Sequence, residues 1–95
     1  MRRAARIDEN QPEVVETFEK MGASVLHTHQ LGQGAPDIVI GYKNKNVLIE
    51  IKDSKKPPSK RRLTPDEEKF HKLWKGDIRV VESADDAANI IREMQ

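Results

Sequence analysis

The stretch GAPDIVIGYKNKNVLIEIKD, residues 34–53, contains two apolar runs joined by a polar turn. The alternating β-branched residues predict two strands over residues 37–42 and 47–52, with Lys-Asn-Lys-Asn as the hairpin turn between them. Apolar strands need no charges at their ends. Here, however, Asp37 opens the first strand and Glu50 and Lys52 close the second. These three charges therefore indicate a functional role.

The geometry of a hairpin predicts where the three charges lie. Side chains alternate between the two faces of a strand, so Glu50 and Lys52 share a face. An even-numbered turn pairs Val39 with Glu50 and Asp37 with Lys52, which places all three charges on one face. Asp37 and Glu50 are then expected to be diagonal neighbours, roughly 7–8 Å apart at the backbone.

This arrangement predicts a metal site. Two converging carboxylates suit Mg²⁺, which prefers oxygen ligands and keeps several waters, and such an ion can bring a phosphate and an activated water together. Lys52 could position or help to deprotonate that water, or neutralise charge on the phosphate. The alternative is a cross-strand salt bridge between Asp37 and Lys52 on a solvent-facing sheet.

Charge is unevenly distributed along the chain. The 95 residues carry a net charge of only +1 and suffice for one domain, residues 1–95. Positive charge gathers at Arg2, Arg3 and Arg6 and again in a proline-containing loop at about residues 54–62, which we expect to be mobile. Such basic patches favour binding to a polyanion, with solvated lysines as the alternative. The candidate DNA-binding residues of this basic loop are Lys55, Lys56, Lys60, Arg61 and Arg62.

Several classes of protein are disfavoured. The chain has no cysteine and therefore neither disulfides nor a thiolate zinc site. We expect no secretory signal, because no apolar run follows the basic N-terminus, and no membrane partner, because no apolar stretch approaches a membrane span. The expected location is cytoplasmic.

The remaining elements complete an α/β pattern. Helical spacing predicts a helix over residues 11–21, with Asp8 or Asn10 as its cap. A strand is expected at 23–29 and a loop at 30–36. Thr64, Pro65 and Glu67 predict a capping box for a helix ending near Trp74. A strand at 78–81 and a final helix after Ser83 follow, so the predicted order is αβββαβα.

These motifs resemble those of a known family. Pro36-Asp37 followed by Glu50-Ile51-Lys52 is similar to the core of the PD-(D/E)XK nucleases, whose fold is restriction-endonuclease-like. More narrowly, RIDENQPEVVETFEKMGASV, GQGAPDIVIGYKNKNVLIEIKD and LTPDEEKFHKLW resemble the virus-type replication-repair nuclease (VRR-NUC) domain, and together they cover most of the chain. The chain departs from the family where Glu67 replaces a usual glutamine and Phe70 a usual tryptophan.

The resemblance implies a mixed sheet flanked by helices and phosphodiester hydrolysis with Mg²⁺ or Mn²⁺. By the family's pattern, Asp37, Glu50 and the Ile51 carbonyl would bind metal, Lys52 would be the catalytic lysine, and Glu13 the first helix's catalytic glutamate, with Glu16 a weaker match. Stand-alone domains of this type behave like Holliday-junction resolvases and act as homodimers in DNA repair. The implied function is therefore structure-selective DNA cleavage, in a cell or by a phage-encoded protein in the host cytoplasm. Cleavage of flaps or nicked DNA, or a catalytically silent DNA-binding module, are the alternatives.

Other polar and aromatic residues have two interpretations each. His27 and His29, on one face of the predicted first strand, could contact phosphate or metal, or could be ordinary strand positions; His71 is a weaker candidate. Asn10 and Gln11 could orient Glu13 or belong to a helix cap. Phe70 and Trp74 are expected in the core rather than as base-stacking platforms, and Glu67 is explained by its capping box.

Overall fold

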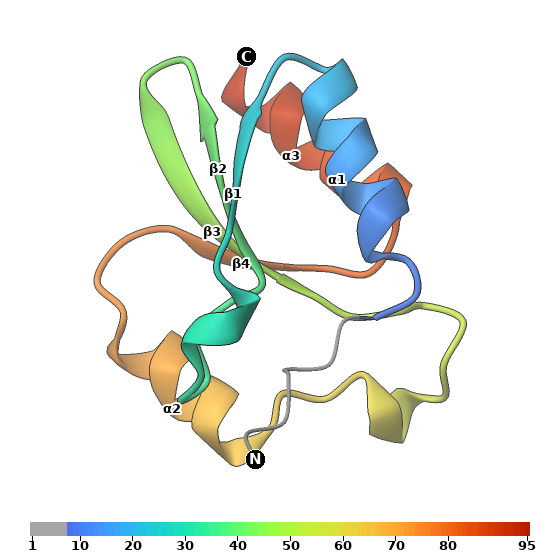
Figure 1. Ribbon diagram of the computed structural model, residues 1–95, viewed down its shortest axis with the longest axis vertical. Helices are drawn as coiled ribbons and strands as arrows, with labels where there is room; N and C mark the ends of the chain where they lie inside the picture. The colour runs from blue at the N-terminus through green and yellow to red at the C-terminus, as the bar shows by residue number, and fades with distance from the viewer. Residues whose placement is uncertain (1–7) are drawn as a thin grey trace.

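The computed structural model describes residues 8–95, which form a four-stranded mixed sheet and three α-helices (Figure 1). The predicted α/β class is confirmed. The basic cluster at Arg2, Arg3 and Arg6 lies outside the described residues. In chain order the elements are α1 (Gln11–Lys20), β1 (Ser24–His27), β2 (Ile38–Tyr42), β3 (Lys45–Ile51), α2 (Pro65–Leu73), β4 (Ile78–Val81) and α3 (Ala84–Met94), with 3₁₀ turns at His29–Leu31 and Pro58–Lys60.

The sheet has the strand order β1-β2-β3-β4, with β3 and β4 parallel and the other pairs antiparallel. The hairpin between β2 and β3 turns on only two residues, Lys43 and Asn44, which have φ angles of 50° and 65°. Positive φ at both positions is the type I′ turn, whose twist matches that of the strands. The longer turn predicted from the sequence is therefore wrong.

The shorter turn moves the register by two positions. Val39 lies opposite Leu48 and not opposite Glu50, as the sequence had predicted. Because side chains alternate with a period of two, this even shift leaves every side chain on its predicted face. The charged residues therefore still share a face, but with different cross-strand partners.

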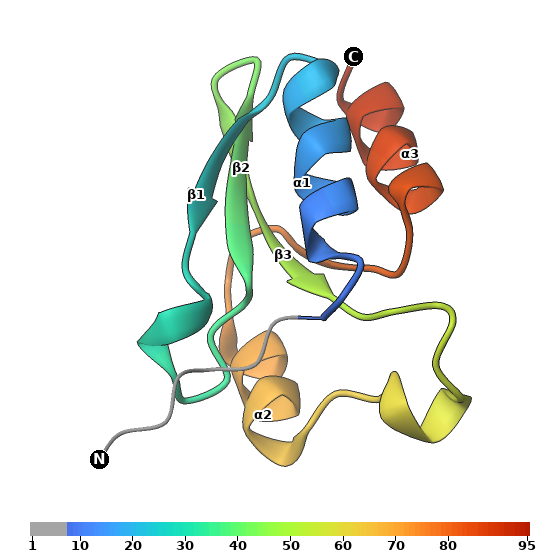
Figure 2. The same cartoon turned by 45° about the vertical axis from the view of Figure 1, so that its right-hand side comes forward.

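The two faces of the sheet differ. Helices α1 and α3 lie together on one face, as Figure 2 shows, and α2 lies beyond the end of the sheet. On the opposite face Leu26, Val39, Leu48 and Ile78 form a row across all four strands, and Leu26 is 63% exposed. The hydrophobic core fills the helix-covered side and consists of Val14, Phe18, Ala23, Ile38, Ile40, Val47, Ile49, Ile51, Val81, Ala87, Ile90 and Ile91.

Helix α2 begins as the sequence predicts but packs differently. Thr64 and Glu67 form the capping box. No residue of α2 is buried, because the helix lies off the sheet rather than on its apolar face. The expectation that Phe70 and Trp74 belong to the core is wrong, since neither is part of it and Trp74 is 44% exposed.

No helix within residues 8–95 combines the length and the apolar character needed to cross a bilayer.

Candidate active site

Two carboxylates meet where β2 begins and β3 ends. The register that pairs Ile38 with Ile49 brings Asp37 opposite Glu50, directly rather than diagonally. The Asp37 amide donates to the Ile49 carbonyl at 3.1 Å, and the Asp37 carboxylate Oδ2 accepts from the Ile51 amide at 2.7 Å. The backbone of β3 therefore fixes the orientation of Asp37 toward Glu50.

The carboxylate pair is electrostatically strained. Glu50 is only 3% exposed, and its Oε1 is buried without a hydrogen-bond partner among the described residues. Burial, reinforced by the neighbouring Asp37, raises the pKa of Glu50 to about 10. Burial also raises the pKa of Asp37, against the opposing hydrogen bond from Ile51. Without a cation, the pair shares a proton at neutral pH.

Lys52 lies beside this pair and is 8% exposed. Its Nζ is 3.8 Å from Glu50 Oε2 but 2.7 Å from Glu67 Oε1. The cross-strand salt bridge with Asp37 is absent from the described residues, because the register places Asp37 opposite Glu50 instead. Burial acts to lower the pKa of Lys52, but the hydrogen bond and charge of Glu67 outweigh it and raise that pKa above 10.5. Lys52 is therefore an ammonium ion at neutral pH, which favours charge neutralisation over deprotonation of a water.

Glu67 makes a contact beyond the capping box that the sequence predicts. Its Oε1 accepts from the Thr64 amide at 2.9 Å, as a capping box requires, and also from Lys52. Burial acts to raise the pKa of Glu67, yet the bonds from Lys52 and Thr64 together lower it. The capping motif explains the bond from Thr64 but not the bond from Lys52, which lies 15 residues away in sequence.

The N-terminal side of the site contains Asp8 and Asn10 rather than Glu13. Glu13 is exposed in the first turn of α1, and no side-chain bond within residues 8–95 joins it to the carboxylate pair. The charge of Asp8, by contrast, acts to raise the pKa of Asp37. The Asn10 amide donates to the carbonyls of Lys52 and Glu82 at 2.9 and 3.1 Å. Asn10 therefore ties the start of α1 to β3 and does not cap α1 through its side chain.

The basic loop is held against the site by ion pairs. Lys56 Nζ contacts Asp8 Oδ1 at 2.9 Å, and Arg61 contacts Glu82 at 3.3 Å and the Lys56 carbonyl at 2.8 Å. The loop contains a 3₁₀ turn, and two of these contacts join it to residues outside the loop. The other candidate DNA-binding residues, Lys55, Lys60 and Arg62, are exposed.

The histidines lie differently from the prediction. β1 ends at His27, and His29 begins a 3₁₀ turn, so the two residues do not share a strand face. Their rings are 6.3 Å apart and nearly perpendicular. His71 lies one turn after Glu67 on α2, and burial lowers its pKa.

The donor set fits a divalent cation. Within residues 8–95 no group of three or more His, Asp or Glu side chains could hold a metal ion. An ion bound here would therefore take the two carboxylates of Asp37 and Glu50 and fill its other positions with backbone, water or phosphate oxygens, as Mg²⁺ commonly does. A cation would give the unpartnered Glu50 Oε1 a partner and would displace the shared proton.

No family model, curated protein or solved structure matches this chain.

Proposed function

We propose that this protein is a Mg²⁺- or Mn²⁺-dependent, structure-selective DNA endonuclease with a PD-(D/E)XK-type site. The observation that carries the proposal is the pair of the half-buried Asp37 and the buried Glu50, with one Glu50 oxygen unpartnered and the charged Lys52 beside it. A buried carboxylate pair is costly unless something compensates it. A divalent cation compensates it and also supports phosphodiester hydrolysis.

Each residue has a distinct task in this proposal. Asp37 and Glu50 hold the cation with the Ile51 carbonyl, and the cation, when bound, lowers the pKa of a water and polarises the phosphate. Lys52, as an ammonium ion, donates to a phosphate oxygen and stabilises the charge that develops there. Glu67 is a positioning residue that keeps Lys52 charged and restrains its Nζ.

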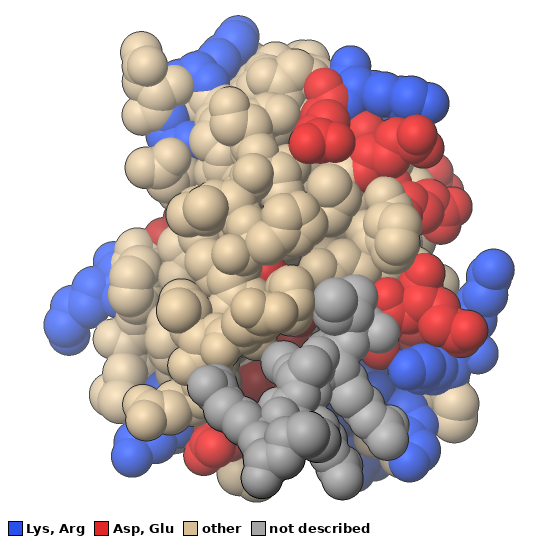
Figure 3. Space-filling view, in the orientation of Figure 1, with Lys and Arg blue, Asp and Glu red and all other residues tan. Residues whose placement is uncertain are grey.

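The charge distribution supports approach of DNA from the side of the basic loop. Acidic side chains gather over α1, on the right of Figure 3, and basic side chains gather at the lower right, in the direction of the basic loop, with others along the left edge and at the top. Lys55, Lys60 and Arg62 are free of ion pairs within the described residues and would contact the phosphate backbone. Such contacts position DNA without reading its sequence.

The symmetry of a four-way DNA junction favours a dimeric enzyme. One site cuts one strand, whereas resolution of a four-way junction needs two symmetric cuts. A homodimer with two-fold symmetry supplies two sites related as the substrate is. A Holliday-junction-resolvase-like activity is therefore the preferred form of the proposal. Cleavage of flaps or nicked DNA is the second form.

The deciding experiment compares a labelled four-way junction with a matched linear duplex, with Mg²⁺, with Mn²⁺ and with chelator. Metal-dependent symmetric cuts by the wild type, lost in Lys52→Ala and Glu50→Ala, would support the resolvase-like form. Salt-sensitive binding to both DNAs without cleavage would favour the catalytically silent binding module. Asp8→Asn and Glu13→Gln, assayed in parallel, test which acidic residue of the N-terminal region acts on the site; we expect only Asp8→Asn to change the metal requirement.

A further inference from the structure

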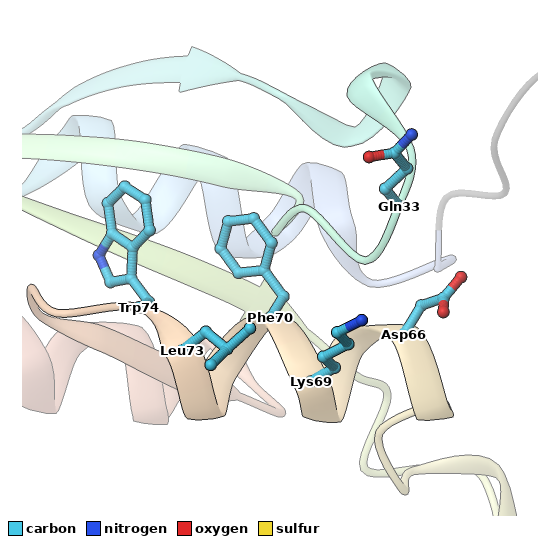
Figure 4. Close-up of a pocket in the computed structure, with 6 residues that line it drawn as sticks. All are labelled: Gln33, Asp66, Lys69, Phe70, Leu73 and Trp74. Carbon is cyan, nitrogen blue, oxygen red and sulfur yellow. The ribbon is translucent and has the colours of Figure 1, made fainter.

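Helix α2 presents an aromatic surface close to Lys52. The rings of Phe70 and Trp74 stack with centroids 5.5 Å apart and an angle of 14° between their planes. Both rings point from α2 toward the strands in Figure 4. They line a cavity of about 370 Å³ together with Gln33, Asp66, Lys69 and Leu73.

We propose that this cavity binds an unpaired nucleobase of the DNA strand being cut, stacked against Phe70 and Trp74. The proposal rests on the proposed nuclease function and extends it to substrate choice. The volume falls within the range of small-ligand pockets. Planar aromatic side chains stack with any base, and the Gln33 amide and the Asp66 carboxylate supply donor and acceptor atoms for a base edge.

The surrounding charges select a nucleic acid over an apolar protein surface. Residues 69–75, KFHKLWK, place three lysines among Phe70, His71 and Trp74. Lys69 lines the cavity, and both it and Lys75 are exposed and can pair with the phosphates that flank a stacked base. Aromatic platforms inside a basic groove are the usual composition of single-strand binding sites. An apolar patch of a second copy would leave these lysines without partners.

Distance connects the cavity to the scissile phosphate. Phe70 and Trp74 follow Glu67 by three and seven residues, which is about 5 and 10 Å along a helix. Because Glu67 Oε1 lies 2.7 Å from Lys52 Nζ, the helix that carries both rings begins beside the lysine that would contact the phosphate. The stacked base would therefore lie within a few nucleotides of the cut, where a branch point leaves bases accessible and a duplex does not.

Gly76 leaves space for the indole. A Cβ at position 76 would lie 2.9 Å from Trp74 Nε1, so a side chain there would push the indole from its place. Trp74 itself is held at the end of α2 by its amide, which donates to the Phe70 carbonyl at 3.0 Å. Gly76→Ala therefore displaces the platform without removing the tryptophan.

Trp74 is the single tryptophan of the chain, so its fluorescence reports directly on stacking. The probes are an unlabelled four-way junction and a short oligothymidylate, titrated in chelator to prevent cleavage. We expect saturable quenching with both DNAs, weakened in Gly76→Ala. By anisotropy with labelled DNA, Trp74→Leu should bind the oligothymidylate about 5- to 150-fold more weakly, the equivalent of about 1–3 kcal/mol per stacked base. Trp74→Phe should restore most of the affinity, and Leu26→Ala, an exposed leucine of the open sheet face, should bind like the wild type.

Saturable binding without quenching, or wild-type affinity in Trp74→Leu, would overturn the proposal. So would a loss of affinity in Trp74→Leu that Trp74→Phe does not restore and that accompanies dissociation of a dimer in sedimentation, because the surface would then contact a second copy. Cleavage of junctions without quenching would remove the base site and leave the nuclease. Quenching in a protein that cuts no DNA would remove the nuclease and leave the base site.

Discussion

Replacement of Glu50 by glutamine should stabilise the protein in chelator at neutral pH and remove the proposed cation site. Glutamine keeps the shape of Glu50 but cannot ionise. The pKa of Glu50 is raised to about 10 in the folded protein, against 4.5 for the free side chain. Between these values the folded state holds a proton that the unfolded state has lost, so stability is greatest at low pH and falls as the pH rises.

The magnitude follows from proton linkage. When the folded state holds one proton more than the unfolded state, each rise of one pH unit lowers the free energy of unfolding by as much as about 1.4 kcal/mol. From pH 5.5 to 7.5 the loss would reach about 2.7 kcal/mol, or a fall in Tm of roughly 10–20 °C for a domain of this size. His71 acts in the opposite direction, because burial lowers its pKa and the folded state then binds fewer protons than the unfolded state. Since His71 is present in both proteins, the difference between wild type and Glu50→Gln isolates Glu50.

The assay is thermal unfolding by circular dichroism at several pH values in chelator. The wild type should lose Tm as the pH rises, whereas Glu50→Gln should not, and Glu68→Gln, which changes an exposed glutamate of α2, should follow the wild type. Saturating Mg²⁺ should reduce the wild-type slope, because the cation displaces the shared proton. A Tm difference between wild type and Glu50→Gln that does not change with pH in chelator over this range would refute the reasoning that Glu50 is buried and protonated.

Three further outcomes test other parts of the site. Glu67→Gln preserves the capping oxygen but removes the charge that raises the pKa of Lys52, so the alkaline limb of the cleavage rate should move to lower pH. Gly34→Ala should lower Tm by several degrees more than Gly32→Ala. Both glycines have positive φ, but a Cβ at Gly34 would meet the Asp66 carbonyl in the first turn of α2, whereas Gly32 faces open space. Lys60→Gln should reduce the slope of log affinity for DNA against log salt by about 1, measured by anisotropy, if Lys60 contacts one phosphate.

The sequence predicted the shared face of Asp37, Glu50 and Lys52 because strand alternation depends only on whether the register shift is even or odd. It did not predict the register itself. A turn with φ > 0 at two non-glycine residues, Lys43 and Asn44, has a weak local signal, since lysine rarely adopts that conformation. Tertiary packing of the strands selects it.

Long-range partners could not be read from local patterns. The capping box of Glu67 was visible within four residues, but its bond to Lys52 depends on where α2 lies relative to β3. The same applies to Asp8, whose influence on Asp37 requires the fold to bring the start of α1 to the end of β3. Phe70 and Trp74 were assigned to the core because apolar residues at helical spacing usually are. That inference fails for a helix that lies beyond the edge of its sheet.

The division of the sheet into two faces explains how so small a chain can hold an unfavourable charge cluster. Burial of the apolar face beneath α1 and α3 provides most of the hydrophobic stabilisation, and none of the site residues on the other face is needed for that core. The half-buried Asp37 and the buried Glu50 can therefore be held together at a cost of a few kcal/mol, which is a large fraction of the stability of a domain. Such a cost is retained where it serves a function. A cation bound by the two carboxylates would remove this cost, so its binding would stabilise the folded protein. Cation binding and folding would then be linked at the end of the sheet where DNA would be cut.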